Sequence, residues 1–268
     1  MDNPHEGDAT VNGVRLHYRL DGPTGAPVVA LVNSLATDLT LWDAQVPVLA
    51  ARYRVLRYDA RGHGRSAAPA GPYSIDMLVD DLLGLLAVVR AERVIVVGVS
   101  LGGLTALATA LRRPPDVVGI VACDCRADMP MEFAEGIDVR NRLVREQGMQ
   151  AIVTAMVERW FTPATLAAKP GYLDAIRRMI FDTSVEGFTG CAEAIKNSGL
   201  RPRVGAIRLP SLFVVGTQDA ALPVAMMQAM QSEVPGSRFA AIADAGHLPN
   251  VERPETFNAA LLEFLDSL

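Results

Sequence analysis

The stretch that decides the fold is Arg93–Gly103, which reads RVIVVGVSLGG. Its first part is rich in β-branched residues, which is typical of a strand that is buried on both faces. Its second part places Ser100 between Gly98 and Gly102, in the Gly-x-Ser-x-Gly pattern of a nucleophile elbow. In such an elbow the chain turns so tightly from strand to helix that the flanking positions must be small. The serine is then held on a strained backbone with its hydroxyl exposed.

Strand and helix patterns alternate on both sides of this elbow. We expect strands at 27–33, 53–59, 93–99, 117–125, 211–219 and 238–242. We expect helices at 42–51, 74–91, 101–113 and 254–268. An Asn12-Gly13 turn between alternating residues predicts a hairpin before them. Because consecutive parallel strands need crossover connections, the alternation predicts an α/β fold with a mostly parallel sheet flanked by helices.

The alternation of strand and helix patterns stops after Arg126, because no long run of β-branched residues follows until about residue 200. Helical patterns appear instead at 139–147, 150–161 and 172–181. We therefore expect an α/β core formed by 1–126 and 198–268, interrupted by a helical cap, or lid, at 127–197.

Composition limits the classes of function. The chain has 268 residues, half of them hydrophobic, and a formal net charge of −5. Its basic residues form no run, so nucleic acid is not an expected partner. The acidic start lacks the features of a signal peptide, and no stretch has the length of a membrane span, so we expect a cytoplasmic protein. The three cysteines lack metal-binding spacing and are expected to be buried or half-buried free thiols.

A serine hydroxyl needs a base before it is a strong nucleophile. His247 follows the last predicted strand, and that loop opens at the same sheet edge as Ser100, so His247 is the predicted base. Of the other histidines, His5 is expected in a disordered tail, His17 in the hairpin and His63 in a glycine-rich turn.

The base in turn needs an acid that orients its ring. Asp219 ends the strand predicted at 211–219 and is the predicted acid. Asp244 is a competitor because it precedes His247 by three residues, but it is expected to shape its own loop. An oxyanion would also need two backbone donors. We assign these to Leu101, at the start of the helix after the elbow, and to Leu35, in the loop after the strand at 27–33.

The elbow, the acid strand and the AGH loop resemble the α/β-hydrolase superfamily over nearly the whole chain. The more specific resemblance is to 3-oxoadipate enol-lactonases of the β-ketoadipate pathway. It is carried by VNGVRLHYRLDG, NSLATDLTLWDAQ, RVLRYDARGHGRS, GPYSIDMLVDDLLGLL, GVSLGGLTA, RWFTP and the CAEAI…LRP segment. The turn at 59–66 resembles one found widely in this superfamily, and we interpret it as scaffold that supports the active-site loops and not as a catalytic element. The chain departs from the enol-lactonase pattern at Ala36, where glycine is expected, and at Ile137, near an expected tryptophan.

The resemblance implies a serine hydrolase that opens an acidic enol-lactone to 3-oxoadipate through an acyl-enzyme, with no cofactor and no metal. It implies that Arg140 pairs with the substrate carboxylate, with Arg126, Arg142 and Arg145 as alternatives. Trp160 and Ser34 are further candidate substrate-binding residues. The alternatives in function are another carboxylester or lactone hydrolase, a cofactor-free haloperoxidase-like enzyme on the same triad, and a non-catalytic ligand receptor.

Overall fold

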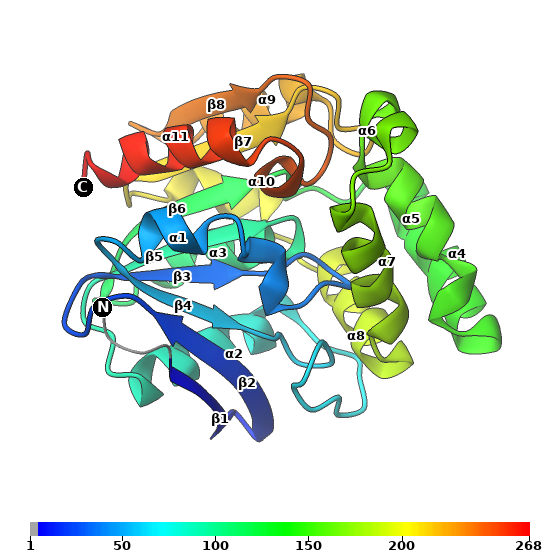
Figure 1. Ribbon diagram of the computed structural model, residues 1–268, viewed down its shortest axis with the longest axis horizontal. Helices are drawn as coiled ribbons and strands as arrows, with labels where there is room; N and C mark the ends of the chain where they lie inside the picture. The colour runs from blue at the N-terminus through cyan, green and yellow to red at the C-terminus, as the bar shows by residue number, and fades with distance from the viewer. Residues whose placement is uncertain (1–4) are drawn as a thin grey trace.

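The computed structural model describes residues 5–268, and its centre is one eight-stranded sheet (Figure 1). The strand order is β1-β2-β4-β3-β5-β6-β7-β8. Strand β2 pairs antiparallel with β1 and β4, whereas every other neighbouring pair is parallel. The mostly parallel sheet predicted from the sequence is therefore present. The strands are β1 His5–Val11, β2 Val14–Asp21, β3 Val28–Val32, β4 Arg54–Tyr58, β5 Val94–Val99, β6 Val117–Cys123, β7 Ser211–Gly216 and β8 Arg238–Ile242.

The N-terminal hairpin turns at Asn12 and Gly13, as predicted, and both residues have positive φ angles, of 48° and 74°. His5 opens β1, and its ring lies 5.9 Å from that of Tyr18 on β2. The expectation of a disordered tail is therefore wrong for His5, because pairing with β2 orders the strand. The rest of that expectation falls on residues 1–4, which lie outside the described residues.

Helices cover both faces of the sheet (Figure 1). One face carries α1 (Val46–Leu49) and α11 (Pro254–Leu265), and the other carries α2 (Ile75–Val88), α3 (Leu101–Arg112) and α9 (Val224–Ser232). As predicted, Ser74 caps α2, because its side chain accepts a hydrogen bond from the Met77 N–H.

The single helix expected at 42–51 is wrong. The segment forms a short 3₁₀ helix, η1 (Leu39–Trp42), and the four-residue helix α1. The Asp38 side chain accepts the Thr40 N–H and starts η1 early. Pro47 has no N–H to donate, so it fits only the first turn of a new helix.

A helical insertion lies between β6 and β7, over the carboxyl ends of the parallel strands (Figure 1). Its first helix starts at Met131, earlier than expected, and the helices at Pro163–Ala168 and Val185–Lys196 were not predicted. The boundaries of the cap at 127 and 197 stay a prediction. The elements from the insertion to the C-terminus are α4 Met131–Gln147, η2 Met149–Ala151, α5 Val153–Trp160, α6 Pro163–Ala168, α7 Tyr172–Asp182, α8 Val185–Lys196, η3 Arg201–Ala206 and, before α11, α10 Pro249–Glu252.

Helix α8 of the insertion sits directly on the turn at 59–66. Gly62 has a φ of 80°, and a Cβ there would lie 2.2 Å from the Cα of Gly187 on α8. Ser184, which caps α8, donates its hydroxyl to the carbonyl of Gly62 over 2.9 Å. The two backbones approach so closely that neither glycine has room for a side chain.

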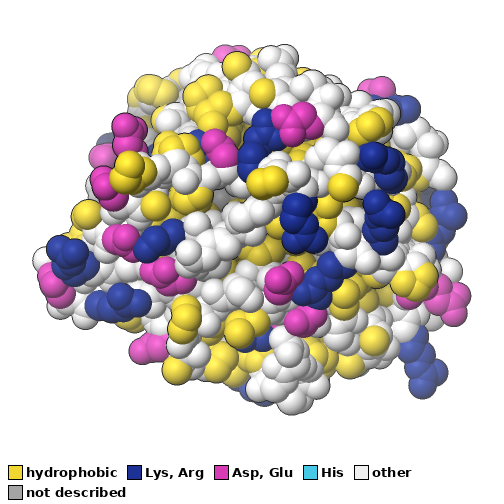
Figure 2. Space-filling view, turned by 180° about the vertical axis from the view of Figure 1, so that it is seen from behind, with side chains coloured by type: hydrophobic (Ala, Val, Ile, Leu, Met, Phe, Trp, Pro, Cys, Tyr) yellow, Lys and Arg dark blue, Asp and Glu magenta, His cyan; other side chains and the backbone are white. Residues whose placement is uncertain are grey.

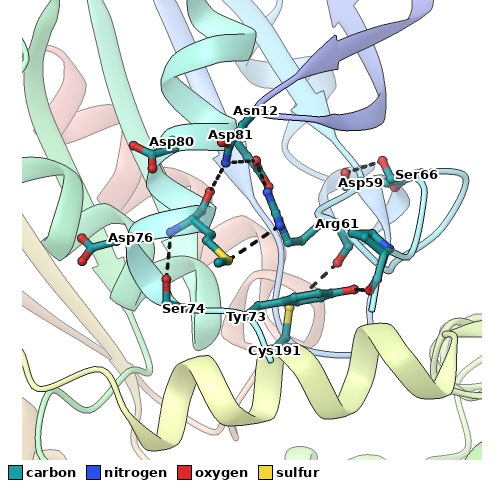
Figure 3. Close-up of polar contacts among 12 residues, drawn as sticks. Asn12, Asp59, Arg61, Ser66, Tyr73, Ser74, Asp76, Asp80, Asp81 and Cys191 are labelled. Carbon is teal, nitrogen blue, oxygen red and sulfur yellow. Dashed lines mark hydrogen bonds and ion pairs between the residues drawn. The ribbon is translucent and has the colours of Figure 1, made fainter. Parts of the chain in front are cut away.

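A buried ion pair supports this contact from the core side (Figure 3). Arg61 donates to both carboxylate oxygens of Asp81 on α2, over 2.6 and 2.5 Å. Its guanidinium also lies 5.3 Å from the centre of the Tyr73 ring, and Figure 3 shows Cys191 reaching toward this cluster from α8. The turn therefore has a structural role, since it fastens the insertion to the core.

The surface has no single-signed face in the view of Figure 2, where acidic and basic side chains are interspersed. Cys123, Cys125 and Cys191 are buried and free, as predicted. Among the helices between residues 5 and 268, none combines the length and the apolar character that a membrane crossing needs.

Candidate active site

Ser100 stands at the sharp turn between β5 and α3. Its φ of 56° and ψ of −112° lie in a region that serine rarely adopts. The glycines on either side allow this turn. A Cβ at Gly98 would lie 2.1 Å from the carbonyl of Gly102, and a Cβ at Gly102 would lie 2.1 Å from the carbonyl oxygen of Val32. The Ser100 N–H donates to the carbonyl of Cys123 over 2.8 Å, which ties the strained turn to the neighbouring strand.

His247 and Asp219 form a buried hydrogen-bonded pair. The Nδ1 of His247 lies 2.8 Å from Oδ2 of Asp219. Because a carboxylate only accepts, Nδ1 carries the proton and Nε2 is left as the basic nitrogen. Burial would raise the pKa of Asp219, but His247 and the N–H of Ala221 outweigh it and hold that pKa below its ordinary value. Asp244 lies apart, exposed, where it accepts a hydrogen bond from Gln218.

The two halves of the site meet in one cavity of about 260 Å³ under the insertion. Ser100 and His247 both line this cavity. The side chain of His247 is hydrogen-bonded to Asp219, and among the described residues no hydrogen bond joins it to Ser100. Hydrogen bonds of this kind are often long before a substrate binds. The cavity brings together every predicted site residue that needs to face a substrate, and its lining includes Ser34, Leu35, Leu101, Arg140 and Trp160.

The loop at 33–37 is held by His63, a buried residue of the turn at 59–66 that was predicted to support the active-site loops. Ala36 has a φ of 60°, a left-handed conformation that explains why glycine was expected there. The N–H of Ala36 donates to Nε2 of His63 over 3.0 Å, and Nδ1–H of His63 donates to the carbonyl of Arg61. Burial lowers the pKa of His63 to about 4, so the ring is neutral and can accept. The N–H of neighbouring Leu35 has no acceptor among the described residues.

Glu252 on α10 is a second supporting residue, and sequence reasoning missed it. One carboxylate oxygen accepts the Gly246 N–H over 2.6 Å, next to His247. The other accepts the N–H and the hydroxyl of Thr162, at 2.9 and 2.6 Å. A second link between the His247 loop and the insertion is the N–H of His247, which donates to the carbonyl of Trp160 over 2.8 Å. The position of the histidine is thereby linked to the insertion, a link between segments about 90 residues apart that no local pattern reveals.

Trp160 also contacts the ring of His247 directly. Its ring is stacked on that of His247, with centroids 6.3 Å apart and an interplanar angle of 25°. Trp160 is therefore part of the cavity wall and restricts the orientation of the imidazole.

Three of the arginines in or near the insertion line the cavity: Arg126, Arg140 and Arg159. Arg126 is paired with Asp128 at 3.2 Å and stacks on the ring of Phe133 at 3.8 Å. Arg140 has no acidic partner among residues 5–268, and Arg159 only approaches the Phe133 ring at 5.6 Å. Burial, and then the charge of Arg159, lower the pKa of Arg140. Two adjacent cations without a counter-ion favour a bound anion.

Neither of the remaining two candidates reaches the cavity. Arg142 and Arg145 are exposed on α4. Within the described chain, Asp124, Asp219 and His247 are the one group with metal-ligand chemistry, with one atom from each lying within 4.8 Å of the others. Because Nδ1 of His247 is already engaged by Asp219, this geometry is that of a hydrogen-bonded cluster. The absence of a metal and a cofactor stays a prediction.

Comparison with known proteins places these observations in a family. Residues 29–260 match the Alpha/beta hydrolase family. The chain is 33% identical to 3-oxoadipate enol-lactonase 2 of Acinetobacter baylyi, with 94% of this chain and 93% of that protein covered.

Solved structures agree. The enol-lactonase from Burkholderia xenovorans has 38% identity and a TM-score of 0.92, covering 97% of this chain and 100% of that one. A thermophilic esterase from Thermogutta terrifontis has 30% identity and a TM-score of 0.91, with 98% of both chains covered. The chain therefore belongs to the alpha/beta hydrolase family and is a hydrolase related to enol-lactonases and esterases.

Proposed function

We propose that the protein is a serine hydrolase that opens an acidic enol-lactone, 3-oxoadipate enol-lactone, through an acyl-enzyme. Ser100 is the nucleophile, His247 the base and Asp219 the acid that orients it. The elbow geometry of Ser100 and the 2.8 Å contact between His247 and Asp219 support these roles. The N–H groups of Leu35 and Leu101 are the proposed oxyanion donors, since both residues line the cavity beside Ser100.

The reaction proceeds in two halves. Oγ of Ser100 attacks the lactone carbonyl while Nε2 of His247 takes its proton, and the ring C–O bond then breaks. The departing enol oxygen receives that proton, and it stays joined to the acyl chain because the substrate is a ring. Water, deprotonated by His247, then attacks the acyl carbon, the bond from that carbon to Oγ of Ser100 breaks, and Oγ takes the proton back from His247 as the acid leaves. The enol tautomerises to the 3-oxo form, which gives a dicarboxylic product.

The observation that carries the choice of substrate is the guanidinium of Arg140 in this cavity, which has no acidic partner in the part of the chain that the structure describes. An acidic lactone supplies the missing carboxylate, and Arg159 next to Arg140 adds a second positive charge. The similarity to enol-lactonases supports the same class of substrate. So does the similar Thermogutta terrifontis esterase, which was solved with malate, a dicarboxylic acid, bound.

The test compares Arg140→Ala with the exposed control Arg142→Ala on an acidic and a neutral substrate. A charge-assisted hydrogen bond contributes about 1.5–3 kcal/mol, so loss of Arg140 raises KM for the enol-lactone by about 10- to 100-fold. KM for a neutral p-nitrophenyl ester changes by less than about 2-fold, because that substrate has no carboxylate to lose. The Arg142→Ala variant behaves like the unmodified enzyme on both.

Other outcomes contradict parts of the proposal. Equal losses on both substrates would assign Arg140 a structural role. If neither Arg140→Ala nor Arg159→Ala affects the acidic lactone, a neutral-ester hydrolase becomes the better account. A protein that turns over no ester at all would be a receptor on a hydrolase fold.

A further inference from the structure

A second buried acid lies behind the pair of Asp219 and His247. Asp124 directly follows β6, which ends at Cys123 and not at Cys125 as expected, because Asp124 adopts a left-handed φ of 41°. Its N–H donates to the carbonyl of Val214 on β7 over 2.9 Å. Its Oδ1 accepts the N–H of Gly216, the last residue of β7, also over 2.9 Å. Asp124 is 1% exposed, so water does not solvate its carboxyl group.

The other oxygen of this carboxyl group has an unusual environment. Oδ2 of Asp124 is buried and receives no N–H or O–H donor from any described residue. One carboxyl oxygen from each aspartate and a ring nitrogen of His247 all lie within 4.8 Å of one another. The carboxyl groups of Asp124 and Asp219 therefore share a small buried volume. Two adjacent carboxylates are not both ionised in such a place, because their repulsion and desolvation are too unfavourable.

The charges around the two acids decide which of them carries the proton. Asp219 faces the Nδ1–H of His247 and the N–H of Ala221, both of which stabilise an anion. Asp124 faces Asp219 and His247 within the cluster, the buried thiols of Cys123 and Cys125 on either side, and one backbone N–H. Burial, and next the negative charge of Asp219, raise the pKa of Asp124 well above its ordinary value.

We propose that Asp124 is a positioning residue that stays protonated and donates its Oδ2–H to the carboxylate of Asp219. This donor holds the Asp219 carboxylate in the orientation that pairs with His247. It also withdraws part of the negative charge of Asp219, so the protonated imidazole is held less strongly than by an isolated carboxylate. The proposal rests on the proposed function in one respect, since Asp219 is taken to orient the catalytic base.

Two substitutions separate this role from a purely structural one. Asp124→Asn preserves the acceptor for Gly216 and replaces the O–H donor with an N–H donor, so it mimics the protonated acid. Its kcat/KM stays within about 3-fold of the unmodified enzyme, and the acidic limb of its pH profile does not move. Asp124→Ala removes both hydrogen bonds. It lowers kcat/KM by about 10- to 100-fold and moves the acidic limb upward by roughly 0.5–1 pH unit.

A third measurement does not depend on turnover or on the folding of the alanine variant. Infrared spectra at about pH 8 show a protonated carboxyl band in the unmodified protein, which is lost in Asp124→Asn. At this pH the exposed acids are ionised, and so is Asp59, whose pKa burial raises to about 6.

The outcomes are distinguishable from failure of the proposed function. If the unmodified protein hydrolyses no ester, the proposed function fails, while the infrared band still reports on Asp124. If the enzyme is active but Asp124→Asn shifts the acidic limb, Asp124 is an anion and the proposal is wrong. The same conclusion follows if the infrared band is missing from the unmodified protein.

Discussion

Acid conditions provide a test of the buried histidine that holds the loop at 33–37. The pKa of His63 is lowered by burial to about 4, against an ordinary value of 6.5. The unfolded chain therefore binds a proton at His63 between pH 6.5 and 4 that the folded protein does not bind. The stability that His63 contributes is fully present above pH 6.5 and is lost as the pH falls toward 4.

The difference between the two pKa values sets the size of the effect. At about 1.4 kcal/mol per unit it amounts to about 3 kcal/mol, and His63 is 1% exposed, so solvent screens little of it. Asp59 opposes this trend, because burial raises its pKa to about 6 and the folded protein gains relative stability as that acid is protonated. The pH dependence of the unmodified protein alone therefore does not isolate His63.

The assay is urea unfolding of the unmodified protein and His63→Gln at pH 7, 6, 5 and about 4. Glutamine keeps an acceptor for the Ala36 N–H but does not titrate. The free energy of unfolding of the unmodified protein falls relative to that of His63→Gln by about 3 kcal/mol across this range, whereas Asp59 contributes equally to both. Parallel curves for the two proteins would refute the reasoning, since they would show that His63 takes up its proton in the folded state as readily as in the unfolded chain.

Three further predictions concern the site itself. Ser100→Ala lowers kcat by several orders of magnitude with the fold intact, and a serine-directed phosphonate labels Ser100 alone in the unmodified protein; labelling of another serine would contradict the assignment. Asp219→Asn lowers kcat by about 10⁴-fold. Asp244→Asn is its control, because Asp244 is exposed and bonded to Gln218. A larger loss of kcat in Asp244→Asn than in Asp219→Asn would exchange the roles of the two residues. Gly102→Ala places a Cβ 2.1 Å from the carbonyl oxygen of Val32, so circular dichroism finds a lower melting temperature; an unchanged melting temperature would show that the elbow relaxes readily.

Local chemistry explains which features could be predicted. The elbow is encoded within five residues, because the strain at Ser100 and the close contacts at Gly98 and Gly102 require those residue types in that order. The pairing of Asp219 with His247 could be inferred from topology, since the carboxyl ends of neighbouring parallel strands meet at one edge of the sheet. Asp219 lies just beyond β7 and not in the strand, but it faces the same edge.

The individual contacts that support the site could not be predicted in this way. His63 reaches Ala36 over 27 positions, and Glu252 reaches Thr162 over 90. His63 lies in the turn predicted as scaffold, but nothing in that turn names Ala36 as its partner, and Glu252 has no motif around it. The helix expected at 42–51 failed for a different reason, since the position of Pro47 and the cap at Asp38 outweighed its hydrophobic pattern.

The order of the core strands, the strained serine turn and the residues at the sheet edge therefore follow from the sequence alone, because each depends on local sterics or hydrophobic periodicity. The tertiary structure was needed to show that Arg140 and Arg159 have no counter-ion among residues 5–268, that Arg142 and Arg145 are exposed, and that Asp124 and Asp219 share one buried volume. Whether a charged group is paired, solvated or neutralised depends on the groups packed around it from distant segments. Those segments include the insertion, which lies over the carboxyl ends of the parallel strands.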